Sequence, residues 1–125
     1  MRPRIALLAV ATLALVACKS GSARLEGKWR GQRADGVSLE AQAAANDYAT
    51  KMEILAKGDQ LTVIAPGSKK TGVYKVLKED SEQLVIATDK NLTGAEKETF
   101  TFLDANTMRW SVAEGRTITF QKVKK

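Results

Sequence analysis

The chain has 125 residues, with 20 Lys and Arg against 14 Asp and Glu, and 44% of its residues are hydrophobic. This length suits one small domain with a single core, and the hydrophobic share excludes a disordered chain. The sequence has no His and one Cys, Cys18, which excludes a disulfide within the chain, a zinc site and a His-based catalytic triad.

The first 17 residues have the composition of a secretory signal peptide. Met1-Arg2-Pro3-Arg4 is basic, and residues 5–16 are apolar and uncharged. A helix over residues 5–16 would cover only about 18 Å of a hydrocarbon core that is about 30 Å thick. The segment is therefore too short for a stable transmembrane span, and we expect residues 1–17 to be removed on export.

The end of this segment, Leu15-Val16-Ala17-Cys18, resembles the lipobox of bacterial lipoproteins. The resemblance implies that the Cys18 thiol receives diacylglycerol, that cleavage precedes Cys18, and that its new amino group is acylated as well, with palmitate. Acyl chains of this number hold a protein firmly, because each buried methylene contributes about 0.8 kcal/mol. Lys19, in place of an Asp, favours by the same resemblance the outer membrane, facing the periplasm.

Residues 18–24 are expected to form the lipidated Cys and a flexible tether, because Ser20-Gly21-Ser22-Ala23 is small and polar. Residues 25–125 then form the domain. Once Arg2 and Arg4 leave with the leader, the balance is 18 − 14 = +4. Such a surface suits anionic lipid headgroups or simple solubility. The basic residues are scattered, so no nucleic acid is expected as a partner.

From Leu25 onward, apolar residues alternate with polar ones and turn residues recur at short intervals. This pattern predicts eight short strands over residues 25–30, 51–57, 60–65, 71–78, 83–88, 97–103, 108–112 and 116–123. Gly58-Asp59 fits a two-residue hairpin turn, because Gly tolerates positive φ. A polar loop is expected over residues 89–94.

One Ala-rich segment, residues 38–50, breaks the alternation and predicts a helix between the first two strands. Ser38 is placed to cap it, and Ala41, Ala45, Tyr48 and Met52 fall at helical spacing. The predicted fold is therefore mainly β: a small antiparallel meander, either a barrel or a curved sheet, with one helix.

Gly27-x-Trp29 at the start of this meander resembles the lipocalin and lipocalin-like families. The resemblance implies that Trp29 closes one end of a barrel whose inside binds a small apolar molecule. The chain departs from the family in its short domain and in a helix that follows the first strand. Trp29, Tyr74 and Trp110 are the candidate ligand-binding residues.

The alternative is that these rings, with those of Phe100, Phe102 and Phe120, fill the interior. An eight-strand barrel is only just wide enough for its own side chains or for one small ligand.

No catalytic set or metal site emerges from the sequence. Residues 89–94 imitate the first half of an EF-hand loop, but its twelfth position, which needs Glu, is Phe100. No cofactor is expected. The sequence favours a non-enzymatic, membrane-anchored accessory or interaction module of the cell envelope, with lipocalin-like binding of a small hydrophobic or amphipathic molecule as the alternative.

Overall fold

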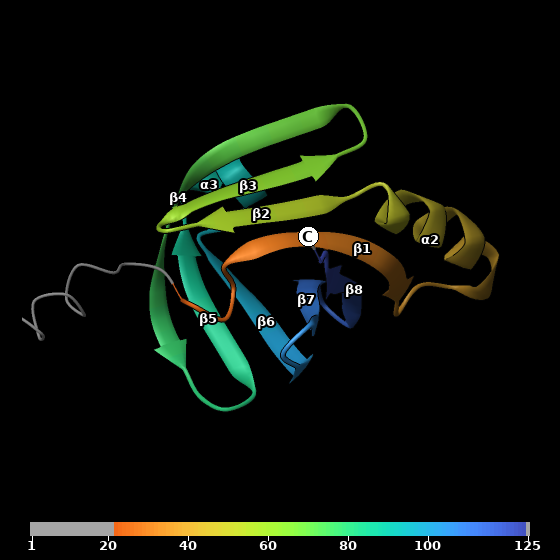
Figure 1. The fold of residues 1–125 in the computed structure, drawn as a ribbon. Coiled ribbons are helices and arrows are strands. Elements are labelled where there is room, and N and C mark those ends of the chain that lie inside the picture. The colour runs from red at the N-terminus through yellow and green to blue at the C-terminus, as the bar shows by residue number, and fades with distance from the viewer. Residues whose placement is uncertain (1–21, 125) are drawn as a thin grey trace, which may run out of the picture.

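A computed structural model describes residues 22–124, which form a closed antiparallel barrel (Figure 1). The eight strands follow one another around the barrel in chain order, and β1 closes it by pairing with β8. Their bounds are β1 Gly27–Asp35, β2 Glu53–Lys57, β3 Gln60–Ala65, β4 Ser68–Glu79, β5 Gln83–Thr88, β6 Lys97–Asp104, β7 Thr107–Ala113 and β8 Arg116–Lys122. The lipocalin-like meander expected from the sequence is confirmed as a barrel rather than an open sheet.

The alternation of apolar and polar residues builds the core. Successive side chains of a strand point to opposite faces, so every second residue turns inward. In β2, Ile54 and Ala56 are buried while Lys57 is exposed, and in β5 Leu84 and Ile86 are buried. The inward residues of all eight strands meet in one cluster, which has its largest fully buried side chains at Trp29, Phe100 and Phe120.

Several strand bounds match the expectation, and β1 differs most. β3 and β5 cover the predicted residues, but β1 continues to Asp35 instead of ending near Arg30. Its second half pairs with β8, and the register shifts between Gly31 and Arg33. This irregularity interrupts the period of two, so the sequence pattern hides the rest of the strand.

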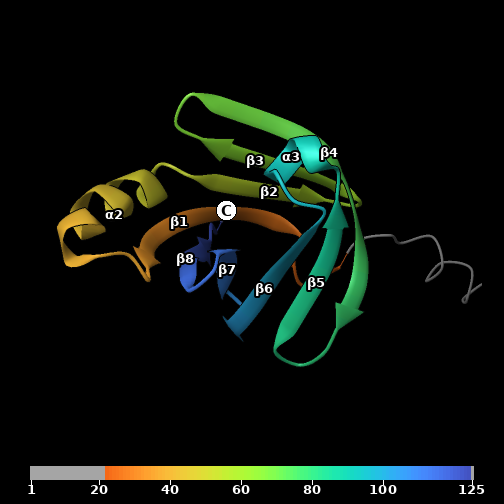
Figure 2. The same cartoon turned by 180° about the vertical axis from the view of Figure 1, so that it is seen from behind.

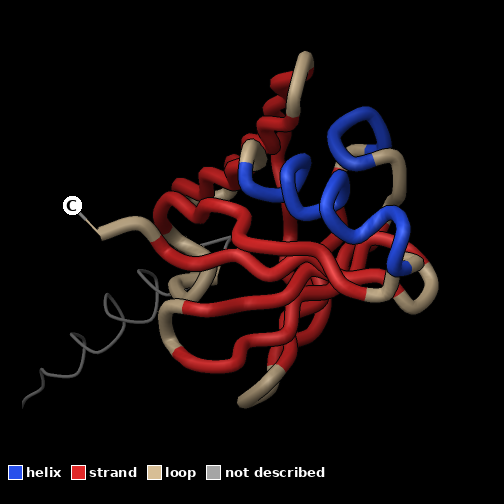
Figure 3. Tube along the Cα trace, turned by 90° about the vertical axis from the view of Figure 1, so that its right-hand side faces the viewer, coloured by secondary structure: helices blue, strands red, loops and turns tan. Residues whose placement is uncertain are grey.

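A helical segment lies between β1 and β2, as expected, and consists of the 3-10 turn η2 (Leu39–Ala41) followed by α2 (Gln42–Thr50). Figure 3 shows this segment lying outside the sheet. The expected capping role of Ser38 is wrong, because its side chain makes no capping hydrogen bond. The expected helix face is right for Met52, which is 5% exposed, and for Ala45, which packs against the core. It is wrong for Tyr48, which is 48% exposed while its neighbour Ala49 is fully buried.

Helix α2 approaches β1 so closely that only glycine fits at position 31. A Cβ atom on Gly31 would lie 1.9 Å from the carbonyl oxygen of Ala49. The Gly31 N–H donates to the carbonyl oxygen of Met52 at 2.9 Å, at the point where the chain leaves the helix for β2. Helix and barrel therefore form one packed unit.

The polar segment after β5 contains a single-turn helix, α3 (Lys90–Thr93), in place of the expected loop. Figure 2 shows α3 beside β3 and β4, the two strands that it contacts. Leu92 is 5% exposed and belongs to the core cluster, so burial of this one apolar side chain accounts for the turn of helix.

The antiparallel order gives the barrel two distinct ends. At one end β1 begins and β8 finishes, and we call it the strap end because residues 22–26, the strap, lie there. At the other, the helix end, β1 leads into η2 and α2, and β5 leads into α3. Within residues 22–124, no helix is long and apolar enough to cross a membrane.

Candidate functional site

The residues singled out from the sequence separate into two groups. Cys18 lies outside the described residues. Trp29, Tyr74 and Trp110 are all buried, with exposed fractions of 0%, 3% and 6%. Trp29 and Tyr74 hold the strap, whereas Trp110 lies near the helix end. The three candidate ligand-binding residues therefore do not form one site.

The strap is fixed to the barrel through its backbone. The indole Nε1–H of Trp29 donates to the carbonyl oxygen of Leu25 at 2.9 Å, and Leu25 itself is fully buried. The Ser22 N–H donates to the Tyr74 hydroxyl at 3.1 Å, and burial raises the pKa of that hydroxyl above its ordinary value. Ser22 is only 5% exposed. The packed domain thus includes Ser22, three residues before the expected boundary at Leu25.

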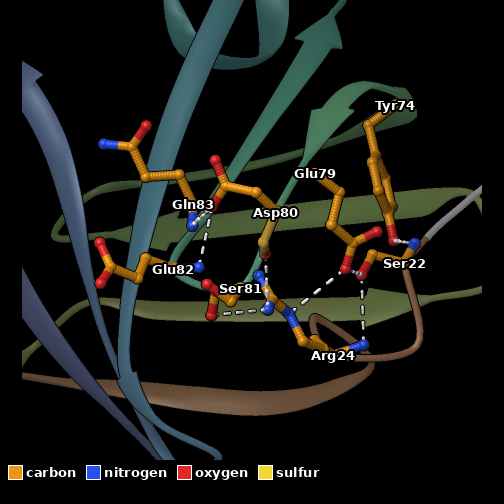
Figure 4. Close-up of polar contacts among 8 residues, drawn as sticks. All are labelled: Ser22, Arg24, Tyr74, Glu79, Asp80, Ser81, Glu82 and Gln83. Atoms are coloured by element: carbon orange, nitrogen blue, oxygen red, sulfur yellow. Dashed lines mark hydrogen bonds and ion pairs between the residues drawn. The ribbon is translucent and has the colours of Figure 1, made fainter.

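Arg24 ties the strap to the β4–β5 turn (Figure 4). Its Nη1 donates to the carbonyl oxygens of Asp80 and Ser81 at 3.0 and 3.2 Å. Its Nε lies 3.3 Å from Oε2 of Glu79, an ion pair without hydrogen-bond geometry. The Ser22 hydroxyl donates to the same Glu79 oxygen at 3.1 Å. The sequence alternation carries no signal for this network, because it joins residues more than fifty positions apart.

The turn that receives Arg24 is itself held by a carboxylate. The Asp80 side chain accepts hydrogen bonds from the backbone N–H groups of Gln83 and Glu82 at 2.8 and 2.9 Å. These two bonds favour the ionised carboxylate and lower the pKa of Asp80 below its ordinary value. The turn therefore presents its carbonyl oxygens to Arg24 in a fixed geometry.

Two cations lie against aromatic rings at the strap end. The Arg24 guanidinium is 4.4 Å from the centroid of the Phe102 ring, and Nζ of Lys122 is 5.0 Å from that of Trp29. Both residues line a cleft of about 510 Å³, together with Phe102 and the half-exposed Leu103. This cleft combines two cations with apolar surface, and the carboxylate of Asp104 lines it as well.

The middle of the barrel is filled by rings. The Phe100 and Trp110 centroids lie 6.0 Å apart, those of Trp110 and Phe120 lie 6.2 Å apart, and Trp29 meets Phe102 edge-on at 6.0 Å. Such separations are typical of packed aromatic pairs. These contacts favour the structural role that the sequence left open for the aromatic residues.

The helix end has a second pocket, of about 420 Å³, lined in part by Glu98 and Trp110. The Trp110 Nε1–H donates to Oε1 of Glu98 at 2.7 Å, and Glu98 is 6% exposed. Glu98 was not among the residues singled out from the sequence. A signal was available, because Glu98 stands two residues before Phe100 and so shares its inward face.

The residues that imitate the first half of an EF-hand loop, 89–94, fold in part into α3. Among residues 22–124, no group of three or more carboxylates could hold a metal ion. The described residues offer two candidate binding features: a partly apolar cleft with two cations at the strap end, and a buried carboxylate at the helix end.

Comparison with known proteins identifies the fold alone. No protein-family model matches the chain, and no curated protein matches it either. It is similar to the crystal structure of an uncharacterized protein from Bacteroides eggerthii, with a TM-score of 0.52 and 16% sequence identity. The match covers 79% of this chain and 99% of that one.

Proposed function

We propose that this chain is a lipid-anchored protein of the bacterial cell envelope, whose barrel serves as a non-enzymatic accessory module held with its strap end against the membrane. Residues 1–17 act as the signal peptide, and Cys18 carries the acyl chains. The anchor lies in the outer membrane and the barrel in the periplasm, an assignment that rests on Lys19 after the Cys.

The observation that carries the proposal is the position of Ser22. This residue is buried and bonded to the barrel four positions after Cys18. Four residues span at most about 13 Å when fully extended. Acyl chains on Cys18 would therefore hold the strap end at the lipid headgroups. The stretch of chain between Cys18 and the barrel is shorter than the seven-residue tether expected from the sequence.

The side chains at this end suit such a surface. Arg24 and Lys122 line the cleft. Lys124, two residues after Lys122, is exposed. Leu103 and Val123 expose apolar side chains at the same end. A basic residue near an anionic leaflet contributes about 1 kcal/mol of attraction. The helix end then points away from the membrane, where Leu39 and Tyr48 are exposed for contact with an envelope protein.

The anchor is tested by fractionating cells that produce the wild-type chain, Cys18→Ser or the control Ser20→Ala. The wild type and Ser20→Ala are expected in the membrane fraction, at the size of the cleaved protein. Cys18→Ser is expected as a soluble or uncleaved precursor, because the lost thiol is the acyl acceptor. Cleaved Cys18→Ser protein held in the membrane like the wild type would contradict the proposal.

A second candidate function, binding of a small amphipathic molecule, is favoured by the pocket at the helix end. That pocket is lined by Trp110, one of the three residues expected to bind a ligand, and has about 420 Å³ of space. Rings occupy the middle of the barrel, so the proposed binding takes place at its end. Pockets of this volume accept small organic molecules.

A further inference from the structure

The pocket at the helix end contains a carboxylate in an unusual setting. Glu98 is the second residue of β6 and lies on its inward face. Only 6% of its surface is exposed. Acidic side chains are almost never this buried unless they are paired. The position calls for a partner.

The described residues supply one hydrogen bond to Glu98. Oε1 accepts the 2.7 Å hydrogen bond from Trp110, and the side chains described in residues 22–89 and 92–124 supply no second hydrogen bond and no ion pair to Glu98. Lys97 is exposed and also lines the pocket, but it forms no ion pair with Glu98. The indole of Trp110 occupies Oε1 and leaves Oε2 as a free acceptor toward the pocket. A cation in the pocket would pair with that oxygen.

The other walls of the pocket define what kind of cation fits. Trp110 is packed against Phe100 and Phe120 inside the barrel, and the 6% of its surface that stays exposed adds aromatic surface to the pocket wall. Val112, at 40% exposure, and Ala113 add apolar surface on the same side. Thr93 and Ser111 contribute hydroxyl-bearing side chains. The combination suits a charged head next to an apolar body rather than a bare metal ion.

We propose that this pocket binds a small organic ammonium compound, with Glu98 as the acceptor for its charged head and Trp110 as the platform for its apolar part. The proposal rests on the second function above, small-molecule binding, and is independent of the lipid anchor. Glu98 has two tasks in this arrangement: Oε1 holds the indole of Trp110 in place, and the remaining oxygen accepts from the ligand.

The test compares two probes of nearly equal shape, 2-phenylethylamine, which is protonated at neutral pH, and 2-phenylethanol, which is neutral. Each is titrated calorimetrically into the mature full-length protein in an uncharged detergent at pH 7 and low salt. The amine is expected to saturate one site and to bind at least tenfold more tightly than the alcohol. Raising the salt concentration should weaken the binding of the amine and leave the binding of the alcohol unchanged.

Glu98→Gln keeps the size of the side chain and the acceptor for Trp110 while removing the charge. It should lower the affinity for the amine at least tenfold and leave the weak binding of the alcohol as it is. Glu96→Gln is the matched control, because Glu96 is exposed on the same connection. It removes the same charge from the protein and should leave amine binding within twofold of the wild type.

Two results would overturn the proposal, and they differ in whether the second proposed function fails with it. Equal binding of amine and alcohol, insensitive to Glu98→Gln, would leave a small-molecule site but eliminate the role of the carboxylate. No binding of either probe to the wild-type protein would eliminate both the ammonium site and the second proposed function. The comparison of the two probes needs no variant, so it stands even if Glu98→Gln folds poorly.

Discussion

The contact between Gly31 and helix α2 gives a prediction whose size follows from the structure. In Gly31→Ala, the new methyl group would lie 1.9 Å from the carbonyl oxygen of Ala49 and 2.9 Å from its carbonyl carbon. Both are backbone atoms, so no side chain can rotate away. To reach an ordinary contact of 3.4 Å, the end of the helix must retreat by about 1.5 Å.

This movement has two costs. It stretches the 2.9 Å hydrogen bond from the Gly31 N–H to the carbonyl oxygen of Met52 beyond bonding distance, and it loosens the packing of the fully buried Ala49. Overpacking costs about 1–3 kcal/mol and a hydrogen bond about 0.5–1.5 kcal/mol, so we expect a loss of about 2–4 kcal/mol. At about 4 °C per kcal/mol for a domain near this size, the melting temperature should fall by about 8–16 °C.

Thermal unfolding followed by circular dichroism measures this loss, with Gly72→Ala as the matched control. Gly72 also lies in a strand, but a methyl group there would meet its nearest atom, in the Leu92 side chain, at an ordinary 3.5 Å. Gly72→Ala should therefore change stability by less than about 1 kcal/mol. A Gly31→Ala protein that melts with the wild type, or no lower than Gly72→Ala, would refute the reasoning.

Two further predictions concern the strap end. Trp29→Ala should lower the free energy of unfolding by about 3–5 kcal/mol, because the ring is fully buried and holds Leu25 through its Nε1–H; a change below about 1 kcal/mol in denaturant unfolding would contradict a core role. Asp80→Asn should melt below the wild type at pH 6. The pKa of Asp80 is lowered on folding, so its contribution is present above its ordinary value of 3.8 and is lost as the pH falls through the folded pKa. The gap between the two melting curves should close below pH 3.8, whereas the exposed control Glu82→Gln should show no such gap at pH 6.

The strands could be predicted because a strand with one buried face has alternating apolar and polar residues in its sequence. Gln60–Ala65 and Gln83–Thr88 match the alternation residue for residue, since each has one face in the core. The pattern fails where the geometry departs from a regular pleat. The shift between Gly31 and Arg33 hides the second half of β1, and one buried Leu92 among polar neighbours hides α3.

The candidate sites were harder to predict, because they depend on pairs that are distant in the sequence. Arg24 reaches carbonyl oxygens 56 and 57 residues away, and no local pattern encodes such a contact. Trp110 was singled out as an inward aromatic residue, but its bond to Glu98 depends on the register between β6 and β7, where Phe100 pairs with Trp110. Trp29 and Tyr74 were expected to meet a ligand and instead bind the strap.

The intact mass of the protein shows whether Cys18 anchors the barrel by its strap end. The protein is extracted from the membranes of cells that produce it, and its mass is measured under denaturing conditions. We expect a chain that begins at Cys18 and carries the additional mass of a diacylglycerol and an acyl group, located on Cys18 by fragmentation. A chain that retains residues 1–17, or one that carries Cys18 unmodified, would contradict this expectation.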